Sequence, residues 1–292
     1  LGDCHFKKQP PVVLKSMGPC NFDVGLLSFE GDAQQQARCL LAPVGPIGKL
    51  TGPLESLPEA LTTVGTAERL PRREALRQLL AERGLEATFS GRLSDPVSHA
   101  HDNDPLSRSA TYFLIHDTSA PNFGGRGWPA DINTDRNINR LARYACGNKI
   151  ERAHIFIIRL GEIFHPHDFS VPWRATKFEM AVEFGSALKG LVLHAELIQP
   201  RRSMTGRGRG NDFLAPAPGF TPEQYDSLAL VYTVASVRAG FWLIPVYHAV
   251  IDEGIFNKHD DPQNFELDAF AASLARLREQ LFTTRVSEPK PE

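Results

Sequence analysis

Short apolar runs recur along residues 107–285, and their lengths predict buried β-strands. They cover residues 110–115, 154–158, 190–197 and 242–246. Residues 161–164 follow the second run closely and predict the return arm of a hairpin.

Longer stretches between these runs predict helices over residues 133–144, 221–238 and 266–281. The second of these carries Thr221 and Gln224 as a capping box, and Gly240 ends it. Strands that alternate with helices are typical of an α/β fold, here a central mixed β-sheet flanked by helices.

Residues 1–105 have a different pattern, because prolines interrupt the early part and only residues 72–83 predict a helix, with Gly84 as its C-terminal cap. Residues 94–105 are polar and turn-rich, which predicts a linker that leaves His99 and His101 solvated. We therefore expect an N-terminal accessory region of unknown role (1–105), an α/β domain (106–285) and a tail (286–292).

Composition narrows the function classes. The chain has 292 residues, 42% hydrophobic and 23% charged, with a formal net charge of -2. This balance is that of an ordinary globular protein, and it gives no field that attracts nucleic acid. No apolar run approaches the length of a membrane span, so we expect no integral membrane segment. The basic stretch 201–210 lacks interleaved aromatic residues, which favours a mobile loop beside a site over an RNA-binding segment.

Four cysteines are present, and none forms a CxxC pair. Cys20 and Cys39 could bridge in an oxidising compartment, whereas buried free thiols are an equally good interpretation.

The candidate chemistry lies where two predicted strands end. His116 follows the first strand, His248 follows the last, and Asp261 precedes Pro262 a short distance later. Each residue alone has an ordinary structural explanation. Together, two imidazoles and one carboxylate with an open fourth position form the ligand set of a catalytic zinc site.

Other polar residues are candidates for the remaining roles. Glu196, near the end of an apolar strand, is costly to bury unless it is paired or functional, which favours a general base. His259 or Lys258 could stabilise an oxyanion. His194 is a candidate for substrate contact or for a packed core histidine, His154 is a weaker substrate-contact candidate, and a polar groove is predicted at Trp173, Arg174 and Lys177.

The order of these segments resembles one known family. The segments are Phe113–Thr118 with Phe123–Gly125, Ala153–Ile163, Gly190–Leu197, Phe220–Ala229 and Ile244–His248 with Asp261-Pro262. Over residues 107–283 they resemble the type 2 N-acetylmuramoyl-L-alanine amidases, zinc enzymes related to peptidoglycan recognition proteins and to a phage lysozyme.

The resemblance implies that His116, His248 and Asp261 bind Zn²⁺ and that Glu196 is the catalytic acidic residue. Members without this glutamate have a tyrosine where this chain has Ala153. The chain departs from the pattern at His259, where the family usually has a lysine, and in a longer segment before Asp261. This longer segment leaves Asp260 as an alternative ligand.

The implied activity is zinc-dependent hydrolysis of the amide bond between N-acetylmuramic acid and L-alanine in peptidoglycan or muropeptides. Such a substrate implies a periplasmic or secreted bacterial protein, and the N-terminal region could bind a protein partner. A non-catalytic peptidoglycan-binding module, a zinc hydrolase of another amide and an antibacterial toxin remain alternatives.

Overall fold

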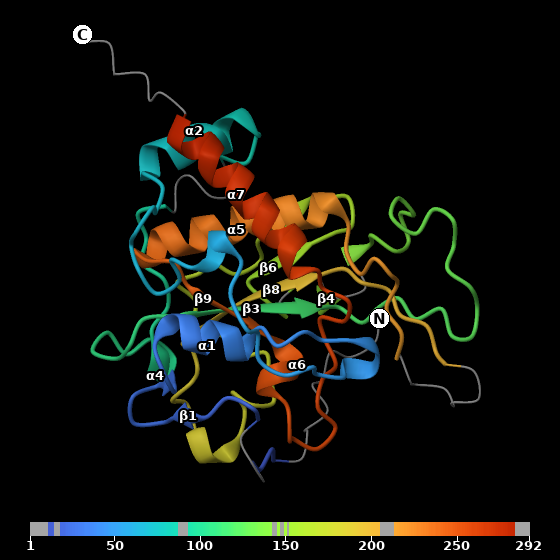
Figure 1. Cartoon of the computed structure of the whole chain (residues 1–292), viewed down its shortest axis with the longest axis horizontal. Helices are drawn as coiled ribbons and strands as arrows, with labels where there is room; N and C mark the ends of the chain where they lie inside the picture. The colour runs from blue at the N-terminus through green and yellow to red at the C-terminus, as the bar shows by residue number, and fades with distance from the viewer. Residues whose placement is uncertain are drawn as a thin grey trace.

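The computed structural model describes residues 11–14, 18–86, 93–141, 145–146, 149–150, 152–204 and 213–283. Its centre is a five-stranded mixed sheet in the order β7-β6-β8-β3-β9. The strands are β3 (Tyr112–Asp117), β6 (Ile155–Ile157), β7 (Ile163–Phe164), β8 (Val192–Leu197) and β9 (Ile244–Tyr247). Helices flank this sheet on both sides, so the predicted α/β class is confirmed (Figure 1).

Parallel pairing dominates the sheet. Strand β3 lies between β8 and β9 and is parallel to both, β6 is parallel to β8, and only β7 is antiparallel. Every residue of β3 is buried, as expected for a strand covered on both faces. The carboxyl ends of β3, β8 and β9 therefore meet at one edge of the sheet.

Two long helices cover one side of the sheet and pack on each other: α5 (Pro222–Ala239) and α7 (Leu267–Thr283) (Figure 1). Helix α5 begins with the predicted capping box and ends at Gly240, whose φ of 83° is left-handed and favours glycine. Helix α7 buries Phe270, Leu274, Leu277 and Leu281, which form one stripe along it. No helix among the described residues is long and apolar enough to cross a membrane.

The other side of the sheet is covered by α1 (Ala33–Leu40) and the short helix α6 (His248–Ile251) (Figure 1). The hydroxyl of Tyr112, on β3, accepts a hydrogen bond from the Phe29 amide and donates one to Gln36 on α1, both 2.9 Å long. Cys20 and Cys39 form a disulfide, which decides between the two interpretations of these cysteines.

The remaining elements are short. They are β1 (Phe22–Asp23), β2 (Ser28–Phe29), β4 (Ala145–Cys146), β5 (Lys149–Ile150), α2 (Arg73–Glu82), α4 (Ala100–Asn103) and the 3₁₀ helices η1 (Pro46–Gly48), η2 (Glu59–Leu61) and η5 (Val182–Phe184).

The N-terminal region shares one hydrophobic core with the sheet. Its buried residues, among them Phe22, Leu40 and Leu76, belong to the same apolar cluster as Phe113 and Val246. Its function as a separate accessory unit stays a prediction.

Residues 94–105, predicted to be a linker, are packed against the rest of the fold. Ser98 is buried, its amide donates to Phe169 O at 2.7 Å, and its carbonyl accepts from the Ala110 amide at 2.7 Å. His99 is half-buried with Nδ1 2.9 Å from Ser107 O, whereas His101 is exposed.

The helix predicted over residues 133–144 is wrong for the described part, where residues 131–140 form turns. The physical reason is competition from short polar side chains. Asp135 Oδ1 accepts from the Asn137 amide at 2.6 Å, and the Asn139 side chain donates to Asn133 O at 3.1 Å. These turns also hold Arg159, which donates to Asn133 Oδ1. Residues 142–144 lie outside the described residues.

An ion pair between Asp168 and Arg238 ties α5 to the loop after β7, with N–O distances of 2.7 and 2.8 Å. Burial acts to raise the pKa of Asp168, but hydrogen bonds from Arg238 and Ser170 outweigh it and lower that pKa. Because the folded pKa lies below the unfolded value of 3.8, the pair stabilises the fold above that pH. This contribution is lost as the pH falls through the folded pKa.

We therefore expect Asp168→Asn to lower the free energy of unfolding by about 1.5–3 kcal/mol at pH 7, the usual range for a hydrogen bond to a charged group. Urea denaturation at pH 7 and at decreasing pH measures this, and the difference from the native protein should narrow in acid. Asp226→Asn is the matched control, because Asp226 pairs with Arg276 on the exposed surface. Equal effects of the two substitutions would contradict the prediction.

Candidate metal centre

Three buried side chains meet at the carboxyl edge of the sheet. His116 is the second-last residue of β3, His248 is the first residue after β9, and Asp261 lies in the following loop. Nδ1 of His116 lies 2.9 Å from Nδ1 of His248, which in turn is 3.1 Å from the Asp261 carboxylate. The three donor atoms all lie within 4.8 Å of one another, so they could hold one metal ion.

The chemistry of this donor set fits a divalent metal. Two imidazole nitrogens and one carboxylate oxygen leave a coordination position open, as in catalytic zinc sites. The same three ligands also bind Fe(II) in another class of enzymes, so the donor set alone does not choose the metal.

His248 is oriented by a second buried carboxylate, Asp252. Its Nε2 lies 3.0 Å from Asp252 Oδ2, and the other oxygen of Asp252 accepts from the Phe178 amide at 2.9 Å. His259 Nδ1 also contacts Asp252 Oδ2 at 2.9 Å, and its ring stacks on that of His248. The three form a second group with possible metal ligands, in which both imidazoles already point at one carboxylate.

The surroundings of His116 and His248 shift the pKa values of the two imidazoles in opposite directions. Burial acts to lower the pKa of His248, but the charges of Asp261 and Asp252 outweigh it and raise that pKa well above its usual value. Burial, followed by the charge of His248, lowers the pKa of His116 well below its usual value. His116 is therefore held neutral, the form that binds metals.

The loop that carries Asp261 is fixed by backbone contacts. The Asp117 amide donates to Asp261 Oδ2 at 3.1 Å, and the Asp261 carbonyl accepts from the Ala249 amide at 2.7 Å. Asp260, the alternative ligand, is turned toward Gln263 Nε2 at 2.6 Å and toward Arg201 at 3.6 Å. The structure thus brings Asp261, rather than Asp260, to the histidines.

Arg201 was predicted to lie in a mobile basic loop, but the structure places it in the interior. Its side chain is fully buried and pairs with Asp117 at 2.7 Å, beneath the loop that carries Asp261. Residues 205–210 of this stretch lie outside the described residues.

Glu196 lies beside His116 on the neighbouring strand β8. It lies directly opposite His116 in the β3–β8 register, and its Oε1 is 3.9 Å from His116 Nδ1. Burial and the charge of Asp261 raise its pKa well above the usual value. Its buried Oε2 has no hydrogen-bond partner in the described part of the chain, so this oxygen is free to accept a proton.

A cleft of about 590 Å³ opens over these residues. Besides the histidines and Asp261, Glu196, Arg152 and Lys177 line it. The Lys177 ammonium donates to Asn257 O, and burial lowers its pKa.

The N-terminal region forms part of the cleft wall through Ile47. The neighbouring Gly48, with a φ of 68°, lies so close to Asp260 that an added Cβ would be 2.6 Å from the Asp260 Cβ. Only a glycine is compatible with this approach.

The other predicted residues are placed as follows. His259 and Lys258 line the cleft, with the Lys258 ammonium paired to Glu253. Trp173 donates to Arg152 O and stacks on His167, and Arg174 donates to Gly185 O; neither lines the cleft. His154 and His194 are fully buried and have no access to it.

The sequence interpretation missed Asp252, Glu179, Arg152 and the buried pair of Arg201 with Asp117. Asp252 carries a local signal, since it lies four residues after His248 and so shares its helical face. The other contacts join segments far apart in the chain and have no such signal.

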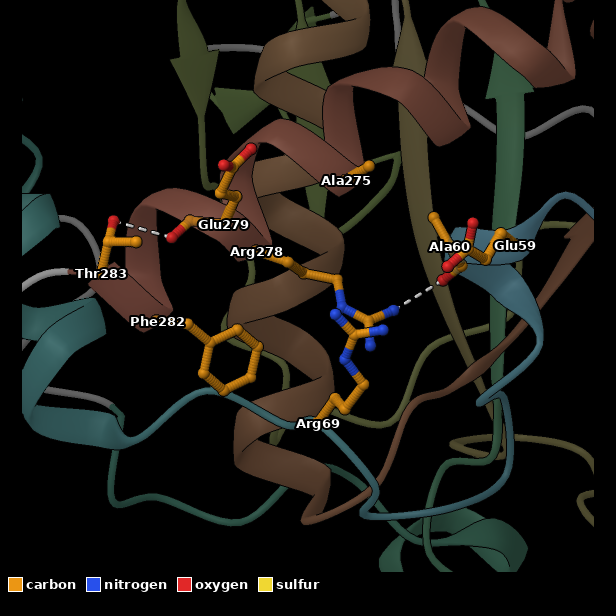
Figure 2. Close-up of a pocket in the computed structure, with 8 residues that line it drawn as sticks. All are labelled: Glu59, Ala60, Arg69, Ala275, Arg278, Glu279, Phe282 and Thr283. Atoms are coloured by element: carbon orange, nitrogen blue, oxygen red, sulfur yellow. Dashed lines mark hydrogen bonds between the residues drawn. The ribbon is translucent and has the colours of Figure 1, made fainter.

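A separate cleft of about 530 Å³ lies between α7, η2 and Arg69 (Figure 2). Arg278 on its wall donates to Ala60 O at 2.8 Å, and its guanidinium lies over the Trp242 ring. These contacts tie α7 to the N-terminal region and give Arg278 a structural role.

Comparison with known proteins gives a limited likeness. No protein-family model matches the chain, and no curated protein matches it by sequence. The crystal structure of the selenomethionine derivative of AmpD is 19% identical with a TM-score of 0.36, covering 61% of this chain and 92% of that one. The endolysin N-acetylmuramoyl-L-alanine amidase LysCS from Clostridium intestinale URNW is 12% identical with a TM-score of 0.33, covering 62% and 90%. At these scores, the functional argument depends on the site itself.

Asp252→Asn tests the orientation of His248. The side-chain oxygen that the asparagine keeps should stay where the Phe178 amide donates to it. The new NH₂ group then faces His248 Nε2 and cannot accept a hydrogen bond from it. With Zn²⁺ as the probe, we expect the affinity of the candidate site for a divalent metal to fall by about 10–100-fold, the usual effect of losing a hydrogen-bond partner of a metal-binding histidine, with the fold retained.

Competition with a chromophoric chelator measures this affinity, and circular dichroism checks the fold. Glu253→Gln is the matched control, because Glu253 is the neighbouring carboxylate and pairs with Lys258 instead. Unchanged affinity in a folded Asp252→Asn variant would show that this contact does not orient the ligand.

Proposed function

We propose that this protein is a zinc-dependent N-acetylmuramoyl-L-alanine amidase, which hydrolyses the amide bond between N-acetylmuramic acid and L-alanine in peptidoglycan or muropeptides. The observation that carries the proposal is the convergence of His116, His248 and Asp261 with Glu196 opposite them in one cleft. The order of the sequence motifs around these residues, described above, supports the choice of substrate.

His116, His248 and Asp261 are the residues that would hold Zn²⁺. When bound, zinc supplies Lewis-acid chemistry, which lowers the pKa of a water molecule and polarises a carbonyl group. Zinc is proposed over iron because of the sequence resemblance, and elemental analysis of the purified protein tests that choice.

Glu196 would act as the general base and then as the general acid. Its free oxygen would take a proton from the attacking water and return it to the leaving amine of L-alanine, so that the net change is hydrolysis of one amide bond. A raised pKa suits this double task, because the carboxyl group must both accept and release a proton near neutral pH.

Side chains around the cleft that can donate hydrogen bonds would stabilise the negative charge that develops on the carbonyl oxygen. His259 and Lys258 are the residues predicted for this role, and both line the cleft. Lys177 and Arg152 line it as well and would bind the anionic groups of a muropeptide.

The proposed substrate implies a periplasmic or secreted protein. The Cys20–Cys39 disulfide supports this location, because such bonds persist in oxidising compartments. Since Ile47 lines the cleft, we propose that the N-terminal region helps to shape the substrate site, and a protein partner for this region remains a further proposal.

Digestion of purified peptidoglycan, with products read by mass spectrometry, tests the function. Zinc-loaded native protein should release stem peptides that begin with L-alanine, and removal of zinc by a chelator should abolish this release. Glu196→Gln should lower the rate by about 10²–10⁴-fold, the usual contribution of a general base, while it still binds zinc.

The matched control is Glu162→Gln, which changes an exposed glutamate at the start of the β7 arm and should leave the rate unchanged. Absence of cleavage by zinc-loaded native protein would refute the amidase, and retained binding to peptidoglycan would then favour the binding module. A fully active Glu196→Gln variant would refute the assignment of the base alone.

A further inference from the structure

Two buried side chains lie in line behind His116, on the side away from the cleft. His194 on β8 places Nδ1 3.0 Å from His116 Nε2, and its own Nε2 is 3.3 Å from Glu179 Oε1. Both side chains are fully buried, with 0% of their surface exposed, so neither can touch a substrate.

Glu179 is anchored by its other oxygen. Oε2 accepts hydrogen bonds from the Ala175 amide, the Thr176 amide and the Thr176 hydroxyl, at 3.1, 3.1 and 2.9 Å. This leaves Oε1 facing His194 Nε2. Although both facing atoms are buried and each needs a hydrogen-bond partner, neither makes a hydrogen bond with good geometry in the described residues, and each is the other's ion-pair contact.

His194 is held in place from a second direction. Its backbone amide donates to His154 Nδ1 at 3.0 Å, and His154 Nε2 lies 2.9 Å from Val171 O. Because a carbonyl only accepts, His154 carries its proton on Nε2. The His154 and His194 rings stack with 2° between their planes, which fixes the plane of His194.

The proton positions along the line from Glu179 through His194 to His116 follow from its carboxylate end. A carboxylate oxygen accepts and an imidazole N–H donates, so the contact with Glu179 Oε1 favours a His194 proton on Nε2, which makes Nδ1 an acceptor. His116 must then donate from Nε2, which leaves its Nδ1 without a proton. That nitrogen is the one that faces His248 and Asp261.

We propose that Glu179 and His194 form a buried relay that holds His116 in the tautomer able to bind a metal through Nδ1. The inference rests on the proposed metal-binding role of His116. Glu179 and His194 are positioning residues, which act through His116 rather than on the substrate. A histidine that binds a metal commonly donates its other N–H directly to a carboxylate. Here the imidazole of His194 lies between His116 and the carboxylate of Glu179.

The Glu179→Gln variant tests the relay, because it should reverse every hydrogen bond in the line. The amide oxygen must stay where Ala175 and Thr176 donate to it, so the NH₂ group faces His194 Nε2 and donates to it. His194 would then donate from Nδ1 to His116 Nε2, and the proton of His116 would move to Nδ1.

Two measurements are expected to change. Long-range ¹H–¹⁵N NMR spectra of the metal-free protein should show His116 protonated at Nε2 in the native chain and at Nδ1 in Glu179→Gln. Zinc affinity, measured by competition with a chromophoric chelator, should fall by about 10–100-fold in the variant. Glu183→Gln, an exposed glutamate four residues along the same segment, is the matched control and should change neither.

If the variant fails to fold, the position of the His116 proton in the native protein still tests the relay. A proton on His116 Nδ1 in native, metal-free protein would overturn the relay, as would native zinc affinity in a folded Glu179→Gln variant. Failure of the amidase proposal would give a different set of results from failure of the relay. A protein with the expected tautomers and zinc affinity that does not cleave peptidoglycan would leave the relay standing.

Discussion

The parallel pairing of β3 with both β8 and β9 is the constraint on which the site depends. In this register His116 lies opposite Glu196, and β9 ends where His248 begins α6. A slip of one residue would turn His116 to the other face of the sheet, and both faces are buried, so the register is strongly specified by packing. The hydrophobic core thus determines which polar groups meet at the carboxyl edge.

Placing so many ionisable groups in a buried position is costly unless each has a partner. The fold meets this cost with carboxylates of fixed orientation. Asp252 faces His248, and the Asp117–Arg201 pair supports the Asp261 loop. The segment of residues 175–179 contributes twice, since its amides hold Glu179 while the Phe178 amide holds Asp252. One short turn therefore fixes the groups behind both histidines.

Local pattern predicted most of the fold because its strands and long helices follow apolar periodicity and caps. The helix expected over residues 133–144 was wrong because periodicity takes no account of Asp and Asn side chains that bond the backbone. His116 and His248 could be found from their places at strand ends. Glu179 could not be found in this way, because its relation to the site arises only when β8 places His194 between Glu179 and His116.

The N-terminal region illustrates the same limit at a larger scale. Its sequence contains no chemical motif, and yet the loop of the third candidate ligand packs against it. The Asn264 amide donates to Val44 O at 2.9 Å, and Gly48 touches Asp260, one residue before Asp261. The Asp261 carboxylate lies 3.1 Å from His248 and 3.7 Å from His116, so a displacement of this loop would separate the three side chains. The region therefore packs directly against the loop that carries Asp261, one of the three candidate metal ligands.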